Sequence, residues 1–202
     1  MDGILSVTPY YNKPTQEGLY QHYKAIASAI RLPIIVYSVQ GRTGVNVEPA
    51  TLARLATIPN IVGVKEASGN ITQMANVIHQ APPEFIVLSG DDAITLPLMA
   101  LGGRGIISVV SNEIPAEMAQ LARHCLAGDF ESARALQRKY LPLMEVNFVE
   151  SNPIPVKAAL GLMGLLEPVY RLPMVPPKAE NLARIEKVLA SVGLLGSVPV
   201  AG

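Results

Sequence analysis

The stretch IVGVKEASGN, residues 61–70, decides the fold class of this 202-residue chain. Its first four residues are all apolar, which is typical of a strand buried on both faces. Lys65 follows without a break, and the Ser-Gly-Asn that ends the stretch indicates a turn and then a helix N-cap at Asn70. Strands of this kind belong to parallel sheets that are covered by helices.

Four more apolar runs and a series of helix-period segments surround this stretch. The predicted strands are 3–8, 34–39, 61–64, 85–89 and 105–110, and the predicted helices between them are 19–30, 50–56, 71–78 and 94–101. Such alternation leaves two α/β folds, a doubly wound sheet or a (β/α)8 barrel. Because no glycine-rich phosphate loop follows the first run, we favour the barrel. A closed barrel has eight strands, so the chain is expected to form an incomplete barrel of about the last five βα units.

Beyond residue 110 the alternation ends and helical patterns continue. Helices are predicted at 115–126, 130–148, 156–163 and 179–190. The expected organisation is therefore a partial barrel at 1–127, a C-terminal helical region at 128–195 and a tail at 196–202.

The composition excludes several functional classes. Apolar residues make up 50% and charged residues 16%, and 16 basic side chains balance 16 acidic ones. This balance gives no electrostatic reason to expect nucleic acid or an acidic membrane as partner. Cys125 is the single cysteine, and neither a signal peptide nor a membrane-length apolar run is present. We expect a cytoplasmic protein without membrane association.

Lys65 carries the clearest chemical signal. Its side chain starts from a buried strand, where loss of solvent lowers a lysine pKa and favours the neutral, nucleophilic amine. The alternative is a lysine that ends the strand and reaches out to water. Tyr37, near the end of the preceding strand, is a candidate proton shuttle or else a packing tyrosine. Arg42, in a glycine-flanked loop, suits a substrate carboxylate or is an ordinary surface arginine.

Weaker signals lie at other strand ends. Tyr10 and Tyr11 form an aromatic pair in a loop, suited to an interface, a pocket or packing. Asp91 and Asp92 are candidates for acid–base groups or a metal site, although capping of the next helix is the simpler interpretation. The glycine-rich segment 102–105 leads from a helix into a strand, so it lies on the face opposite the active end and does not indicate phosphate binding. The three histidines do not cluster at metal-ligand spacing, and we expect no metal; they are His22, His79 and His124.

Taken together, the motifs resemble the dihydrodipicolinate synthase family of lysine-dependent class I aldolases. The matching segments are SVTPYYNKPTQEGLYQHY, IVYSVQGRTG, IVGVKEASGN, LSGDD, GGRGIISV, NPIPVKAAL and RLPM, and they run in register to about residue 195. The resemblance implies a (β/α)8 barrel followed by helices. It also implies condensation of pyruvate with aspartate 4-semialdehyde to 4-hydroxy-tetrahydrodipicolinate, in lysine and diaminopimelate biosynthesis, with no cofactor.

By this resemblance, Lys65 forms the imine with pyruvate, Tyr37 transfers protons and Arg42 holds the carboxylate of the semialdehyde. The resemblance also assigns substrate binding to Thr43 and to the main chain of Gly90 and Ile107. Tyr11 resembles a tyrosine that reaches into the neighbouring subunit's proton relay. The family's tight dimer, formed through Tyr10 and Tyr11, and its tetramer imply a homo-oligomer.

The chain also departs from the family pattern. Its first strand matches the family's fourth, and the family's Gly-Thr-Thr-Gly motif has no counterpart, since the sequence contains no Thr-Thr pair. Ser38-Val39-Gln40 stands where the family has Asn-Val-Pro. We therefore expect an N-terminally truncated synthase with little activity alone. Two alternatives remain: another pyruvate lyase, such as N-acetylneuraminate lyase or a keto-deoxy-sugar-acid aldolase, or a non-enzymatic gene fragment.

Overall fold

The computed structural model describes residues 1–195, and the predicted tail at 196–202 lies outside that range. The chain divides into two compact units, Met1–Ile107 and Ser108–Gly202. The sequence prediction placed a domain limit at 127, after the end of strand–helix alternation, and did not consider compactness. That limit stays a prediction. Each unit is described by itself.

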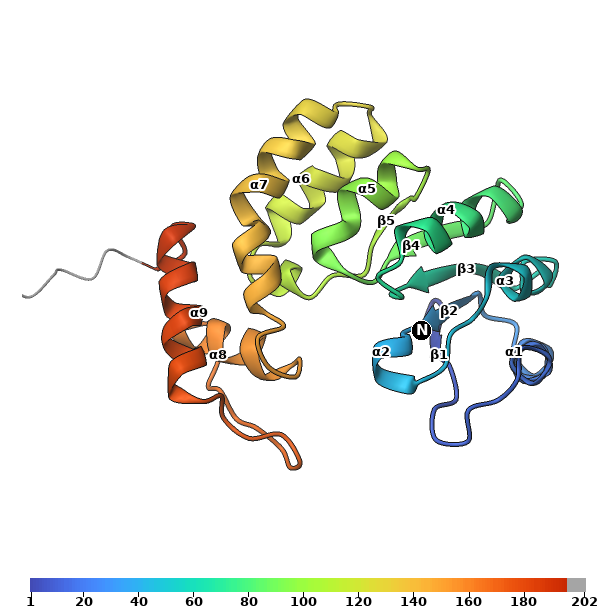
Figure 1. Cartoon of the computed structure of the whole chain (residues 1–202), viewed down its shortest axis with the longest axis horizontal. Helices are drawn as coiled ribbons and strands as arrows, with labels where there is room; N and C mark the ends of the chain where they lie inside the picture. Colours follow the sequence, from blue (N-terminus) through green and yellow to red (C-terminus); the bar gives the residue numbers. More distant parts are fainter. Residues whose placement is uncertain (196–202) are drawn as a thin grey trace, which may run out of the picture. The chain divides into compact units, whose positions relative to one another are not determined.

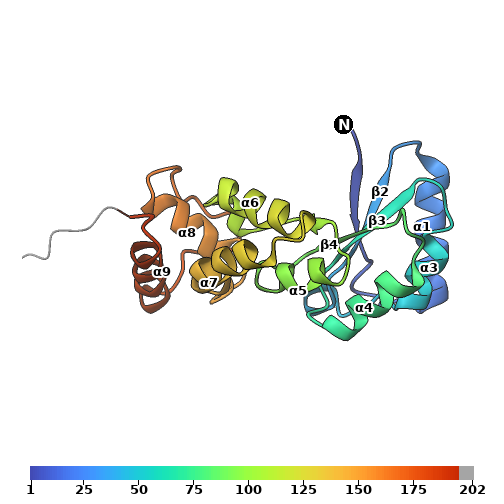
Figure 2. The same cartoon turned by 90° about the horizontal axis from the view of Figure 1, so that it is seen from above.

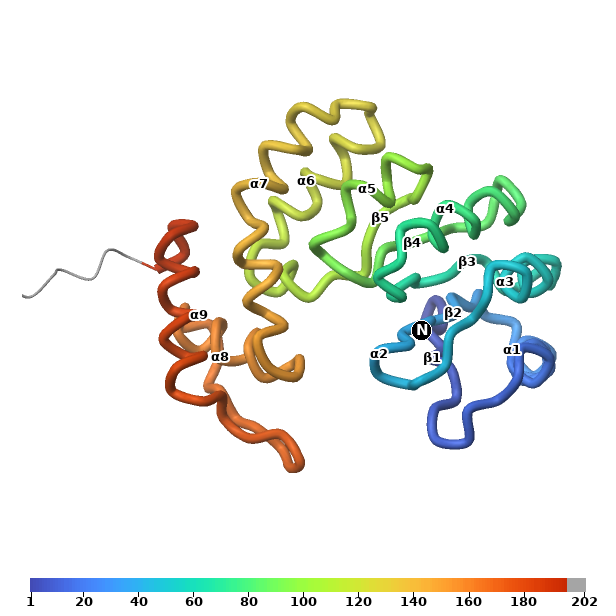
Figure 3. The backbone as a smooth tube through the Cα atoms, viewed as in Figure 1, coloured from blue at the N-terminus to red at the C-terminus, as the bar shows by residue number. Residues whose placement is uncertain are grey.

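The first unit contains a five-stranded sheet in which every neighbouring pair is parallel. Strand order in the sheet equals strand order in the chain, as the tube in Figure 3 shows. The strands are β1 (Ile4–Val7), β2 (Ile34–Ser38), β3 (Ile61–Glu66), β4 (Ile86–Ser89) and β5 (Gly105–Ile106). The predicted parallel α/β architecture with five strands is confirmed.

Four helices of the first unit contribute to the core behind this sheet. They are α1 (Gln16–Ala29), α3 (Pro49–Leu55), α4 (Ile71–Gln80) and α5 (Thr95–Ala100). Figures 1 and 2 show α1, α3 and α4 on one side of the strands. One buried cluster joins Leu19 of α1, Leu52 of α3 and Met74 of α4 to Val36 and Val64 of the sheet. Burial of these apolar side chains is the main force that holds the helices on the sheet.

The two faces of the sheet differ because successive residues of a strand point to opposite sides. Val36 and Val64 are fully buried on the helix side. On the other face, Leu5 and Val7 of the edge strand β1 are 45% and 46% exposed. Tyr37 and Lys65 share this second face, one residue beyond the buried valines.

Two strand limits differ from the sequence prediction by two residues or more. β5 ends at Ile106 instead of residue 110, and Val110–Asn112 forms a 3-10 turn. Ser111 N–H donates to the Ser108 hydroxyl at 2.8 Å and Asn112 Nδ2 donates to the Val109 carbonyl at 2.7 Å, so local hydrogen bonds replace the strand ladder. In contrast, β3 continues two residues past Val64 and includes Lys65.

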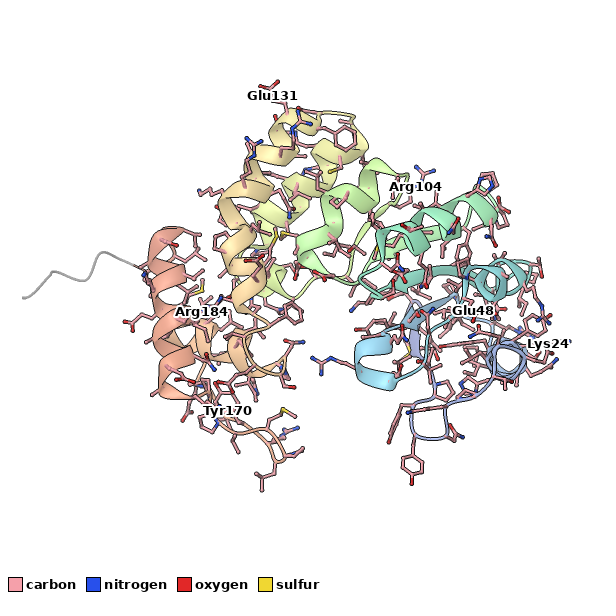
Figure 4. The ribbon with its side chains drawn as sticks, viewed as in Figure 1. Lys24, Glu48, Arg104, Glu131, Tyr170 and Arg184 are labelled. Atoms are coloured by element: carbon pink, nitrogen blue, oxygen red, sulfur yellow. The ribbon has the colours of Figure 1, made fainter. Side chains whose placement is uncertain are left out.

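The second unit is helical within the described residues. Its helices are α6 (Pro115–Leu126), α7 (Phe130–Val146), α8 (Ile154–Leu162) and α9 (Ala179–Ser191). α6 packs on α7, and α9 packs on α7 and α8. The segment between α8 and α9 carries Tyr170, which Figure 4 labels. Within residues 1–195, no helix combines the length and apolarity that crossing a membrane requires.

Candidate active site

Lys65 and Tyr37 lie side by side on adjacent strands, near the carboxyl ends of β3 and β2. Parallel pairing places the two residues opposite each other in register. The Lys65 Nζ atom is 4.2 Å from the centroid of the Tyr37 ring. The sequence predicted both residues as site candidates, and the fold brings them together.

The surroundings of Lys65 favour its neutral form. Burial lowers the pKa of the Lys65 amine, because the ammonium loses solvent, and the Arg42 guanidinium lowers it further. The Asp92 carboxylate acts in the opposite sense, and the net direction is a pKa below the ordinary value. A lowered pKa increases the share of the neutral amine, which is the form that attacks a carbonyl carbon.

Tyr37 is held in its protonated form. Burial raises the pKa of the Tyr37 hydroxyl, and the positive charge of Arg42 offsets part of that rise. The phenol therefore keeps its proton at neutral pH and is a suitable proton donor beside the Lys65 amine.

Arg42 lies on the short helix α2 (Gln40–Thr43), directly after β2, and its side chain is exposed. Its charge acts on both Lys65 and Tyr37, so the guanidinium belongs to the same site. Thr43 is buried, and its hydroxyl donates to the Val39 and Val45 carbonyls at 3.2 and 3.1 Å while it accepts from the Val45 N–H at 3.1 Å. The geometry gives Thr43 a role in shaping the loop that carries Arg42; substrate contact through Thr43 stays a prediction.

Gly90 and Ile107 directly follow β4 and β5, and β4 is the neighbour of the Lys65 strand. A methyl group on Gly90 would stand 2.6 Å from the Ala67 Cβ and 3.2 Å from the Lys65 Cε. The absence of a side chain here therefore leaves room for the lysine. The N–H groups of Gly90 and Ile107 donate to the Glu66 and Ser89 carbonyls at 2.8 and 2.9 Å, so substrate contact through these residues would use their carbonyls.

Tyr10 and Tyr11 do not join this group. Their side chains are 67% and 90% exposed in the loop that follows β1, so Tyr11 does not pack against the half-buried Lys65. Its predicted role in a neighbouring subunit stays a prediction.

The sequence interpretation underestimated Asp92 and missed the buried side chains behind the site. Asp91 accepts from the Ala93 N–H at 2.9 Å and is the predicted cap. Asp92, in contrast, is 1% exposed and acts electrostatically on Lys65. Glu66 was missed as well, although strand alternation from Lys65 would have placed it on the helix side.

Two further observations concern alternative sites. Among residues 1–195, no three histidine, cysteine, aspartate or glutamate side chains gather as a metal site would require. A pocket of about 390 Å³ in the second unit, lined by Lys157, Tyr170 and Met174 among others, contains none of the predicted site residues.

Comparison with known proteins identifies close relatives of the whole chain. A sequence model of the Dihydrodipicolinate synthetase family matches residues 1–192. The chain is 55% identical over 201 residues to 4-hydroxy-tetrahydrodipicolinate synthase from Koribacter versatilis, and the match covers 100% of this chain and 67% of that protein.

Solved structures agree with the sequence match. Dihydrodipicolinate synthase from Thermotoga maritima superimposes with a TM-score of 0.94 at 51% identity, covering 96% of this chain and 67% of that one. The Acinetobacter baumannii enzyme, solved in complex with pyruvate, gives a TM-score of 0.94 at 46% identity, with the same two coverages of 96% and 67%. The chain therefore spans about two thirds of the length of these relatives.

Proposed function

Because this chain belongs to the Dihydrodipicolinate synthetase family, we propose that its site performs the family's reaction, the condensation of pyruvate with aspartate 4-semialdehyde to 4-hydroxy-tetrahydrodipicolinate. The observation that carries the proposal is the Lys65 amine, 4.2 Å from the Tyr37 ring centroid with its pKa lowered by burial. Pyruvate as first substrate is supported by a relative, the Acinetobacter baumannii enzyme, which was solved with pyruvate bound.

The first half of the reaction uses Lys65 and Tyr37. The neutral amine of Lys65 attacks the keto carbon of pyruvate, and the new carbon–nitrogen bond gives a carbinolamine. Tyr37 donates a proton to the departing hydroxyl, which leaves as water, and an imine remains. Loss of a proton from the pyruvate methyl group then gives an enamine. No cofactor is needed, because the protonated imine itself accepts the electrons.

The second half joins the two substrates. The enamine carbon forms a bond to the aldehyde carbon of aspartate semialdehyde, whose oxygen takes up a proton. Arg42 binds the semialdehyde carboxylate and orients it, as a guanidinium does in a paired contact with a carboxylate. The amino group of the semialdehyde then attacks the imine carbon, expels the Lys65 amine and closes the ring.

Gly90 and Ile107 line the pyruvate site in this proposal, and Tyr10 and Tyr11 contact a second copy of the chain. The exposure of the two tyrosines, 67% and 90%, supports an interface role, since large exposed aromatic side chains are typical of contact surfaces. Thr43 and Tyr11 have less direct roles in this proposal than Lys65, Tyr37 and Arg42.

A single-turnover experiment tests the proposed function against a sugar-acid lyase and against a chain without chemistry. The chain, extended ahead of residue 1 by the family's first three βα units, is loaded with pyruvate, one aldehyde is added, and the remaining imine is reduced with borohydride and quantified. Aspartate semialdehyde is expected to deplete the trapped imine, whereas N-acetylmannosamine leaves it unchanged. Depletion by the sugar alone would assign a sugar-acid lyase instead, and no trapping with pyruvate in any sample would contradict both enzymatic functions.

A further inference from the structure

A partly buried polar network lies behind Lys65, on the helix side of the sheet. Glu66 follows Lys65 in β3 and is fully buried. Its Oε1 accepts a hydrogen bond from Gln73 Nε2 at 2.9 Å, and its Oε2 accepts from the Ser68 N–H at 3.3 Å. Because neighbouring residues of a strand share one backbone, the contacts of Glu66 also fix the position from which the Lys65 side chain starts.

Gln73 of α4 connects this carboxylate to the loop that follows Arg42. Its Nε2 donates to Asn46 Oδ1 at 3.0 Å, and its Oε1 accepts from Asn46 Nδ2 at 2.8 Å. The two amides thus form a reciprocal pair, and the bond from Gln73 Nε2 to the Glu66 carboxylate determines which way both of them face. The Asn46 carbonyl in turn accepts from Gln16 Nε2 at 2.8 Å.

The loop itself is fastened at several points. Asn46 is four residues after Arg42. Val47 N–H donates to the buried Ser38 hydroxyl at 3.2 Å, and the Gln16 side chain accepts from the Glu48 N–H at 3.1 Å; Glu48 is labelled in Figure 4. The Gln73–Asn46 pair is the contact that joins this loop to Glu66 and hence to the strand of Lys65.

We infer that Gln73 is a positioning residue, which, through its hydrogen bonds to Glu66 and Asn46, holds the Arg42 loop against the Lys65 strand and fixes the guanidinium relative to the amine. The inference rests on the proposed function for the roles of Lys65 and Arg42. Its geometric part is independent of any substrate.

The expected consequence is measurable without turnover. Arg42 lowers the pKa of Lys65, and the other ionisable groups that act on or contact the amine are Asp92 and Tyr37. Gln73→Met keeps the length of the side chain and removes its two donors and its acceptor. The loop then loses its link to β3, the guanidinium moves, and the pKa of Lys65 rises.

Competitive acetylation of the protein with acetic anhydride, quantified by peptide mass spectrometry across a pH series, gives the reactivity of Lys65 against that of exposed Lys24 and Lys187. Gln73→Met is expected to slow Lys65 labelling at neutral pH roughly two- to tenfold, the range for a displaced charge in a partly solvated site. Arg42→Ala is also expected to slow the labelling of Lys65. In the double variant the two effects should not add, because Gln73 acts through Arg42.

Gln80→Met is the matched control, since Gln80 is exposed on the same helix and its labelling should equal that of the wild type. If Gln73→Met does not fold, as judged by circular dichroism and thermal unfolding, Asn46→Ser breaks the same link from the other side and is expected to give the same slowing.

Labelling of Lys65 at the wild-type rate in folded Gln73→Met or Asn46→Ser, while Arg42→Ala slows it, would overturn the inference. Additive effects in the double variant would overturn it too. Borohydride trapping with pyruvate separates this result from the proposed function: absent trapping in the wild type contradicts the function alone, because the acetylation profile does not depend on pyruvate.

Discussion

At the scale of single residues, the chemistry depends on two side chains whose pKa values burial shifts in opposite directions. Burial raises the pKa of Tyr37 and lowers that of Lys65, so it favours a proton donor and a neutral nucleophile, with the amine 4.2 Å from the ring centroid. Such a pair has the two functions that imine formation requires, attack on carbon and protonation of the departing oxygen.

The hydroxyl of Tyr37 is expected to matter far more than its ring. Tyr37→Phe removes only that hydroxyl, and proton transfer by a positioned side chain contributes roughly 100- to 10,000-fold to a rate. The rate of imine formation with pyruvate, followed by quenching with borohydride at successive times, should fall by such a factor. Tyr20→Phe, at a position on α1 outside the site, is the control. A loss of less than about threefold would mean that Tyr37 only packs beside Lys65.

The guanidinium of Arg42 is expected to act mainly on the second substrate. Hydrogen bonds to a charged group are worth about 1.5–3 kcal/mol, so Arg42→Ala should raise the apparent KM for aspartate semialdehyde roughly 10- to 100-fold. The pyruvate imine still forms in this variant. Its rate of formation falls only by the amount that the higher pKa of Lys65 causes. Steady-state kinetics of the extended chain described below would measure this. An equal loss of pyruvate trapping at every pH would give Arg42 a structural role instead.

At the scale of elements, β3 contains both the apolar run that predicts the fold class and the lysine that carries the chemistry. Its apolar half, residues 61–64, was predictable because it follows a simple periodicity, and so was the Asn70 cap, which accepts from the Gln73 N–H at 3.1 Å. The network around Glu66 was not, because Gln73, which donates to Glu66, also pairs with Asn46, 27 residues away in the loop after α2. The early end of β5 was missed for a related reason: local serine and asparagine hydrogen bonds outweigh an apolar run.

The pH dependence of folding stability tests the role of Glu66 in β3. Burial raises the pKa of Glu66, and hydrogen bonds from Ser68 and Gln73 only partly oppose that rise. The folded pKa therefore exceeds the unfolded value near 4.5, so this group's contribution to stability is fully present below the unfolded pKa and is lost as pH rises through the folded one.

Glu66→Gln replaces the carboxylate by a neutral side chain of the same shape. The amide groups of Gln73 and Asn46 can both flip, so that Gln73 accepts a hydrogen bond from the new amide. The variant should need more urea to unfold than the wild type at neutral pH, and this gain should shrink as pH falls through the folded pKa and be absent below 4.5, the unfolded reference. A variant that is less stable than the wild type at neutral pH would show that the ionised carboxylate stabilises the fold.

At the scale of the whole molecule, the chain matches 67% of the length of its Thermotoga maritima relative, and its sheet has five strands where a closed barrel has eight. Recognition of the family required the joint presence of many segments, since Lys65, Tyr37 or Arg42 taken singly also fits an ordinary structural role. The exposed apolar side chains of β1, Leu5 and Val7, lie at an edge that a closed barrel would cover.

Residues 1–202 on their own are therefore expected to form little ring product. The comparison is an extended chain, in which the first three βα units that the family resemblance implies, with their Gly-Thr-Thr-Gly motif, are placed ahead of residue 1 to supply further strands and the Thr-Thr pair that this sequence lacks. A product assay from pyruvate and aspartate semialdehyde should give markedly higher specific activity for the extended chain. Comparable activities would mean that the five-stranded unit is sufficient for the reaction.

The central claim, that Lys65 is the amine that takes pyruvate, has one direct measurement. The protein is incubated with pyruvate, reduced with borohydride and digested, and the modified peptide is sequenced by tandem mass spectrometry. A reduced pyruvate adduct is expected on Lys65, with none on Lys157 or Lys187 and none in Lys65→Ala, while Lys157→Ala still traps pyruvate. An adduct of equal yield in Lys65→Ala, or one located on another lysine, would contradict it.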